Sequence, residues 1–138
     1  FSRPSLSWDL HAPDEREGSG SIVFNTDVDP LEIMAFSAPS VVPDRRDWRR
    51  AVRCDPSDIC GEKDTNITWV RTDVDDLGAG MFTVEYDVPE EGFLAFYMQM
   101  RYEGPEGRDM WFTTEANIIP SFFPWPDCQG SNCTGILK

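Results

Sequence analysis

The stretch GFLAFYMQMRY, residues 92–102, is the longest β-type run in the chain and decides the fold class. Its ends alternate apolar and polar residues while its middle is apolar on both faces, which is typical of a strand in the centre of a sheet. The next residues, EGPEGRD at 103–109, carry the Gly and Pro of a hairpin loop. Residues 110–119, MWFTTEANII, are therefore predicted to return as the partner strand.

Shorter runs of the same kind precede this hairpin. Residues 80–88, GMFTVEYDV, alternate cleanly, which places Phe82, Val84 and Tyr86 on one face of a strand. Further strands are predicted at 3–8, 20–25, 31–36 and 67–72, separated by turn sequences at 13–20, 29–30, 75–80 and 89–92. About seven short strands at this spacing predict an all-β fold, an antiparallel β-sandwich of immunoglobulin or fibronectin III type.

Length and charge limit the remaining possibilities. The 138 residues suit one core, and we expect residues 1–124 to form the sandwich and 125–138 a disulfide-closed tail. No run approaches the length of a membrane span. The net charge of −13 argues against a nucleic-acid partner, because that binding needs a basic surface. The chain begins at Phe1 without an initiator Met, so we interpret it as a processed piece of a longer protein.

Cysteines and glycosylation sequons predict the compartment. The four cysteines form two close pairs: Cys54 with Cys60, and Cys128 with Cys133. No CxxC motif occurs and the single His11 is remote, so two small disulfide loops are favoured over zinc. Sequons at Asn66 and Asn132 favour the same oxidising compartment. We therefore predict a secreted glycoprotein, with four reduced thiols in a cytosolic chain as the alternative.

An arginine-rich stretch, VVPDRRDWRRAVRC at 41–54, stands out in this acidic chain. Asp44 and Asp47 can pair with its arginines, and Trp48 can anchor the segment under an arginine face. A structural loop is therefore favoured over a partner-docking patch, and both over a nucleic-acid site. The docking candidates are the loop residues Arg45, Arg46, Trp48 and Arg49, together with Phe122, Phe123 and Trp125 of the aromatic tail.

The residues reveal no catalytic or metal-binding set. One His, no G-x-S-x-G motif and cysteines that look paired predict that this chain is not an enzyme. The acidic turns at 27–29 and 73–76 do not reproduce an EF-hand loop, so neither calcium nor another cofactor is expected. Nine Phe, five Trp and three Tyr could line a pocket for an apolar ligand. Filling a core and an interface is the preferred interpretation of these aromatic residues.

Several elements, taken in order, resemble a known family. They are Arg3 and Pro4 followed by Trp8, residues 44–48 overlapping the RDWR sequence at 46–49, residues 92–97, and FTTE at 112–115 followed by Ile119 and Pro120. In this order they look like the C-terminal region of the PhoPQ-activated pathogenicity-related proteins, a group that includes the secreted autocrine proliferation repressor proteins. The resemblance covers residues 3–124, while residues 54–60 and the tail after Trp125 depart from it.

The resemblance implies an architecture and a role. In that family a larger α/β-hydrolase-like domain precedes this region, and no catalytic residue carries over to the present chain. The implied function is a non-catalytic binding module that docks on an α/β-hydrolase-like chain from the same precursor. Two alternatives remain: a carrier of an apolar small molecule such as a pigment or lipid, and an interface contributor to a hydrolase whose nucleophile lies on the partner chain.

Overall fold

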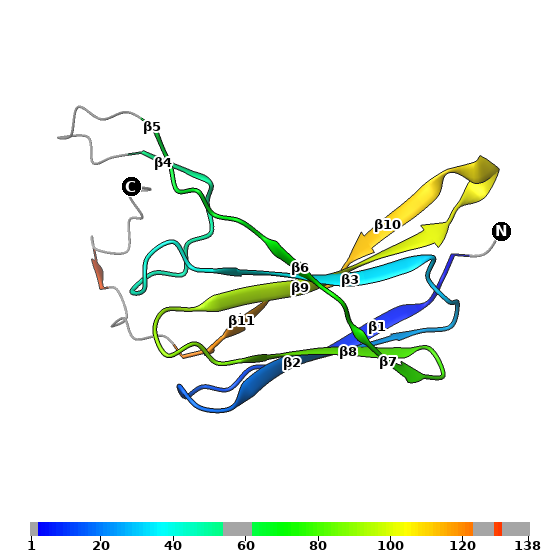
Figure 1. Ribbon diagram of the computed structural model, residues 1–138, viewed down its shortest axis with the longest axis horizontal. Coiled ribbons are helices and arrows are strands. Elements are labelled where there is room, and N and C mark those ends of the chain that lie inside the picture. The colour runs from blue at the N-terminus through cyan, green and yellow to red at the C-terminus, as the bar shows by residue number, and fades with distance from the viewer. Residues whose placement is uncertain (1–2, 54–61, 123–128, 131–138) are drawn as a thin grey trace.

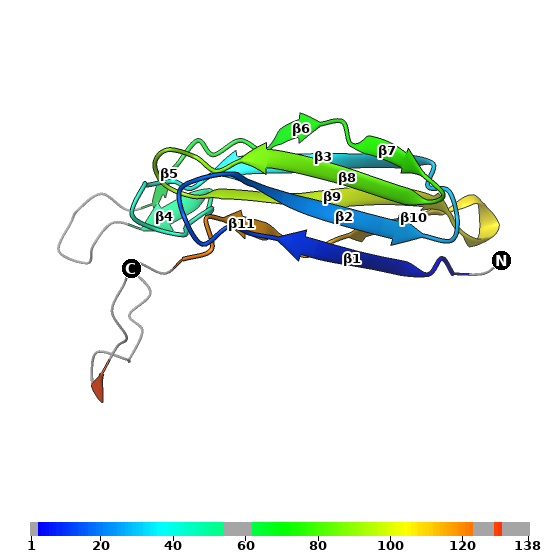
Figure 2. The same cartoon turned by 90° about the horizontal axis from the view of Figure 1, so that it is seen from below.

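A computed structural model describes residues 3–53, 62–122 and 129–130, and over these residues strands dominate in two stacked layers (Figures 1 and 2). The strands are β1 (Leu6–His11), β2 (Ser19–Thr26), β3 (Glu32–Pro39), β4 (Ala51–Arg53), β5 (Glu62–Asp64), β6 (Val70–Thr72), β7 (Asp75–Gly78), β8 (Met81–Asp87), β9 (Leu94–Glu103), β10 (Asp109–Thr113) and β11 (Asn117–Ile119). A short 3-10 helix, Pro105–Gly107, lies between β9 and β10. In this described part of the chain, no helix is long and apolar enough to cross a membrane.

The strand order is that of an immunoglobulin-type sandwich. One sheet has the order β1-β2-β8-β7, and the other has β10-β9-β3-β6 with β11 also paired to β9. Immunoglobulin-type sandwiches place strands A, B, E and D in one sheet and C, F and G in the other. Here strands A to G are β1, β2, β3, β7, β8, β9 and β10, β6 is an added edge strand, and β4–β5 is an inserted hairpin. The predicted all-β sandwich is confirmed.

The core forms where the two sheets face each other. The predicted central strand is confirmed, because β9 pairs with β3, β10 and β11. Every second residue of β9 points into the core, as the alternation of its sequence requires. The core residues are Ile22, Phe24, Ala35, Phe82, Val84, Phe96, Met98, Met100, Tyr102 and Ile119. Burial of one large apolar side chain stabilises the fold by about 1.5–3 kcal/mol, so this layer holds the sheets together.

Two predicted element boundaries were wrong. The sequence predicts a turn at 75–80, but β7 occupies most of it and pairs with β8, Asp75 opposite Thr83. All four β7 residues are exposed, so this edge strand is held by backbone pairing and shows no apolar alternation. The sequence also predicts one strand at 110–119, but β10 and β11 are separate. The Thr114 hydroxyl accepts the Met98 N–H at 3.0 Å, replacing a backbone carbonyl in the ladder.

Other predicted strands are shifted or shortened. β1 lies at Leu6–His11 rather than 3–8, and the run predicted at 67–72 is a strand only at Val70–Thr72. The β4–β5 hairpin was not predicted, so the described residues hold eleven strands where about seven were expected. The predicted boundary between residues 124 and 125 and the disulfide-closed tail lie outside the described residues.

Candidate functional site

Four segments that follow or precede strands meet at one end of the sandwich, on the left of Figure 1. They are residues 12–18, 40–50, 88–93 and 120–122. Each contributes to a set of contacts between two arginines and two phenylalanines, which we call the arginine–aromatic cluster: Arg16, Arg46, Phe93 and Phe122. Arg46 and Phe122 are predicted docking residues, whereas the sequence did not single out Arg16 or Phe93.

The two guanidinium groups of the cluster lie on aromatic rings. The Arg46 guanidinium carbon is 5.0 Å from the Phe93 ring centroid, and that of Arg16 is 5.3 Å from the Phe122 centroid. The two ring centroids are 5.9 Å apart. A cation over a ring within about 6 Å contributes roughly 0.5–2 kcal/mol, increasing with desolvation. The cluster therefore ties the 40–50 loop to the start of β9 and to the end of the described sandwich.

Backbone carbonyls complete the binding of both cations. Arg46 Nη2 donates to the Pro120 and Phe122 carbonyl oxygens at 3.2 and 3.1 Å. Arg16 Nη1 donates to the Gly92 oxygen at 2.7 Å. Burial lowers the pKa of Arg46, yet a guanidinium stays protonated at any physiological pH. The cluster therefore links the four segments through two positively charged guanidinium groups.

The 40–50 loop is held by its own backbone and by Trp48. The Val41 N–H donates to the Asp47 carbonyl oxygen at 2.8 Å and closes the loop. The Trp48 indole N–H donates to the Ala38 carbonyl oxygen of β3 at 2.8 Å. Trp48 therefore anchors the loop through its indole nitrogen, and its predicted position under an arginine face stays a prediction.

An ion pair orders the outer part of this loop. The Arg49 guanidinium contacts the Asp47 carboxylate at 2.6 Å, which is the local pairing expected from the sequence. Hydrogen bonds from Arg49, opposed by partial burial, lower the pKa of Asp47 from 3.8 to about 2. Asp47 is therefore ionised throughout the physiological range, and its ion pair with Arg49 persists there.

The arginines of the loop divide into two groups. Arg46 is half-buried in the cluster, whereas the Arg49 and Arg50 side chains are 51% and 77% exposed. Arg45 is exposed as well. The loop thus combines an anchored base with a set of solvent-facing positive charges. Docking by this loop remains a prediction.

Asn66 is the predicted glycosylation residue that the structure describes. It is exposed, and its φ of 55° lies in the left-handed region that Asn tolerates. A groove of about 300 Å³ runs beside it, lined by Pro39, Ser40, Val41 and residues 65–68. Its modification remains a prediction. Seven other predicted site residues lie outside the described residues: Cys54, Cys60, Cys128, Cys133, Asn132, Phe123 and Trp125.

Metal-ligating groups are dispersed in the described residues. No three His, Cys, Asp or Glu side chains there lie close enough to hold a metal ion. Asp73, and Asp75 and Asp76 at the start of β7, are exposed.

Comparisons with known proteins give one informative match. No protein-family model matches the chain, and no solved structure matches it significantly. Autocrine proliferation repressor protein A of Dictyostelium discoideum is 24% identical to it over 141 aligned positions. The alignment covers 96% of this chain, which spans only 28% of the length of that relative. The chain is therefore similar, over nearly its whole length, to one part of a longer autocrine proliferation repressor protein.

Proposed function

We propose that this chain is the non-catalytic β-sandwich piece of a secreted autocrine-proliferation-repressor-like protein and that it docks on an α/β-hydrolase-like chain or domain. The observation that carries the proposal is the unequal coverage of the match, 96% of this chain against 28% of the relative. That coverage, together with a hydrophobic core between the two sheets, supports the interpretation of the chain as a module of a larger protein.

The 40–50 loop is the surface that best suits this docking role. Three of its arginines, Arg45, Arg49 and Arg50, are exposed on a chain with a net charge of −13, and Arg49 and Arg50 are each also paired with an Asp. Arginine is enriched among the residues that dominate binding energy at interfaces. The Trp48 hydrogen bond and the Arg46 contacts fix the loop before binding, which reduces the entropy lost on association. We therefore expect an acidic surface on the partner.

Two observations support secretion. The sequon at Asn66 is exposed, as glycosylation requires. The cysteines occur as two close pairs, a spacing that suits disulfides in an oxidising compartment.

Native mass spectrometry of protein purified from its source tests the docking. We expect an α/β-hydrolase-like chain or domain encoded by the same precursor. Replacing Arg45 with Glu should weaken the complex several-fold, mainly through slower association, because a charge at an interface rim steers the encounter. Arg108→Glu, at an exposed site in the β9–β10 connection, is the matched control and should leave affinity unchanged. A free monomer, or equal effects of the two variants, would contradict the proposal.

A fluorophosphonate probe tests whether the chain is catalytic. We expect no label on this chain, because its sequence offers no activated serine. Label on the partner alone would show an active hydrolase beside a non-catalytic sandwich. Label on this chain would overturn the assignment.

A further inference from the structure

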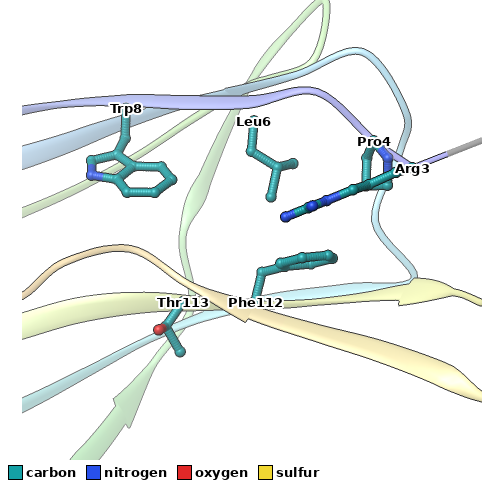
Figure 3. Close-up of a pocket in the computed structure, with 6 residues that line it drawn as sticks. All are labelled: Arg3, Pro4, Leu6, Trp8, Phe112 and Thr113. Atoms are coloured by element: carbon teal, nitrogen blue, oxygen red, sulfur yellow. The ribbon is translucent and has the colours of Figure 1, made fainter.

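A cleft of about 300 Å³ opens between the two sheets along one edge of the sandwich. Its walls come from β1, an edge strand of the first sheet, and β10, an edge strand of the second. Six residues line it: Arg3, Pro4, Leu6, Trp8, Phe112 and Thr113 (Figure 3). None of them belongs to the arginine–aromatic cluster, so the cleft is a separate feature of the molecule.

The cleft has an apolar interior with one cation over it. Leu6, Trp8 and Phe112 are half-buried and pack against the core. The Arg3 guanidinium carbon lies 5.7 Å from the Phe112 ring centroid, and Figure 3 shows the extended Arg3 side chain over this ring. In the same view Leu6 points into the space between Arg3 and Trp8. A ligand inside would meet apolar surface and a positively charged group together.

The environment of Arg3 differs from that of four other arginines, two on the sheets and two in the 40–50 loop. Arg49, Arg50, Arg71 and Arg101 each form an ion pair with an Asp or Glu. Within the described residues, no carboxylate lies within ion-pair distance of Arg3, although the chain carries 25 Asp and Glu. Its planar set of N–H donors suits a carboxylate, and Figure 3 shows the guanidinium between Leu6 and the Phe112 ring.

We propose that this cleft binds a small aromatic carboxylate. The carboxylate would accept hydrogen bonds from the Arg3 guanidinium, and the aromatic body would lie against Leu6 and Trp8. The volume is at the lower limit for small-molecule sites, which suits a ligand of one or two rings. This site is independent of the proposed docking role.

The test uses the 138-residue chain and two matched probes, 2-naphthoate and its neutral isostere 2-naphthamide. Binding is followed by calorimetry and by the NMR signal of the Trp8 indole N–H. We expect 2-naphthoate to bind with Kd on the order of 100 μM, typical of a ligand this small. The amide should bind about tenfold more weakly, because it lacks the charge-assisted hydrogen bonds.

Variants assign the binding to particular side chains. Arg3→Gln should reduce the affinity for 2-naphthoate about tenfold and leave 2-naphthamide unchanged, because Arg3 is exposed and its loss leaves the core intact. Arg108→Gln, at another exposed arginine, should change neither affinity. Trp8→Leu should weaken both probes, and near-ultraviolet circular dichroism would show whether it folds.

Three outcomes would overturn the proposal. They are no binding of 2-naphthoate up to its solubility limit, equal affinity for the two probes, and an unchanged affinity in Arg3→Gln. Arg3→Gln decides the question even if Trp8→Leu fails to fold. Loss of partner docking in the native protein would leave these results unaffected, so the two proposals fail separately.

Discussion

Gly80 lies where the backbone leaves no room for a Cβ atom. Its φ is +75°, and an added Cβ would collide with the carbonyl oxygen of Thr26 on β2. The Thr26 N–H in turn donates a hydrogen bond to the Gly80 carbonyl oxygen at 2.9 Å. Close approach of the β7–β8 turn to β2 therefore requires glycine here.

Gly80→Ala should destabilise the protein by about 3 kcal/mol or more, because the clash adds to the strain of a positive φ. Gly78→Ala is the control, since Gly78 has a similar φ of +83° and no atom within 4 Å of an added Cβ. We expect it to cost only about 1 kcal/mol. Urea denaturation measures the free energy of unfolding of the two variants. Equal losses of stability would show that the close approach of Gly80 to Thr26 does not contribute.

The ion pair between Asp47 and Arg49 makes stability depend on acid pH. The folded-state pKa of Asp47 is lowered from 3.8 to about 2, so its ionised form is stabilised by folding. This contribution is complete above about pH 4 and is lost as the pH falls through 2. Asp47→Asn should remove this part of the acid dependence, as seen in urea midpoints measured at decreasing pH. Asp87→Asn, at an exposed β8 residue, is the control, and identical pH profiles for both variants would contradict the assignment.

At the scale of elements, β11 joins the two sheets. Asn117 is 2% exposed, and its Nδ2 donates to the His11 oxygen at 2.9 Å and the Ser21 oxygen at 3.0 Å. Those carbonyls belong to β1 and β2 in the first sheet, whereas β11 pairs with β9 in the second. A buried amide that spans the layers holds this end of the sandwich together.

Asn117→Ala should cost about 2–4 kcal/mol, because it deletes two buried hydrogen bonds and leaves two carbonyls without their donor. Asn25→Ala, on β2 and half-exposed, is the matched control and should cost less than about 1 kcal/mol. Thermal or urea denaturation compares them. If Asn117→Ala lost no more stability than Asn25→Ala, the two Asn117 hydrogen bonds would not be what holds β11 in place.

Local side-chain bonds also explain the elements that sequence patterns misplace. The Thr114 hydroxyl satisfies a backbone N–H of β9, so the strand predicted at 110–119 is interrupted without losing that hydrogen bond. β7 carries no buried side chain and owes its place to pairing with β8. Alternation of apolar and polar residues indicates burial on one face of a strand. Neither the Thr114 hydrogen bond nor the β7–β8 pairing depends on such burial.

At the scale of the whole molecule, the predicted disulfide between Cys54 and Cys60 concerns the connection between β4 and β5. β4 and β5 pair with Arg53 opposite Glu62, and Cys54 and Cys60 fall between these residues in sequence. We expect intact mass spectrometry to show two disulfides, with the mass rising on reduction by two hydrogens for each bond. Alkylation of the unreduced protein at all four cysteines would contradict it.

Intact mass spectrometry also tests the predicted glycosylation of Asn66. An N-glycan on Asn66 should disappear from the Asn66→Gln variant, while Asn25→Gln, outside any sequon, should keep the full mass. An unmodified mass for protein from a secreting eukaryotic host would count against glycosylation at this residue.

The fold class could be predicted from local patterns in the amino-acid sequence. Burial on one face of a strand is a period-two property of neighbouring residues, so the runs at 80–88 and 92–102 revealed the core faces of β8 and β9. The Gly and Pro of residues 103–109 likewise marked the β9–β10 hairpin. Local pairing in the 40–50 loop was also accessible, since Asp47 and Arg49 are close in sequence.

Contacts between residues far apart in the chain could not be predicted in this way, because they depend on how the strands assemble. Arg16 reaches Phe93 and Phe122 because the strand order brings three connections to one end of the sandwich, and alternation carries no information about that order. The cleft beneath Arg3 exists because β1 and β10 are edge strands of different sheets. Both features are contacts between segments far apart in the chain, so they depend on how the sheets are assembled rather than on any local pattern.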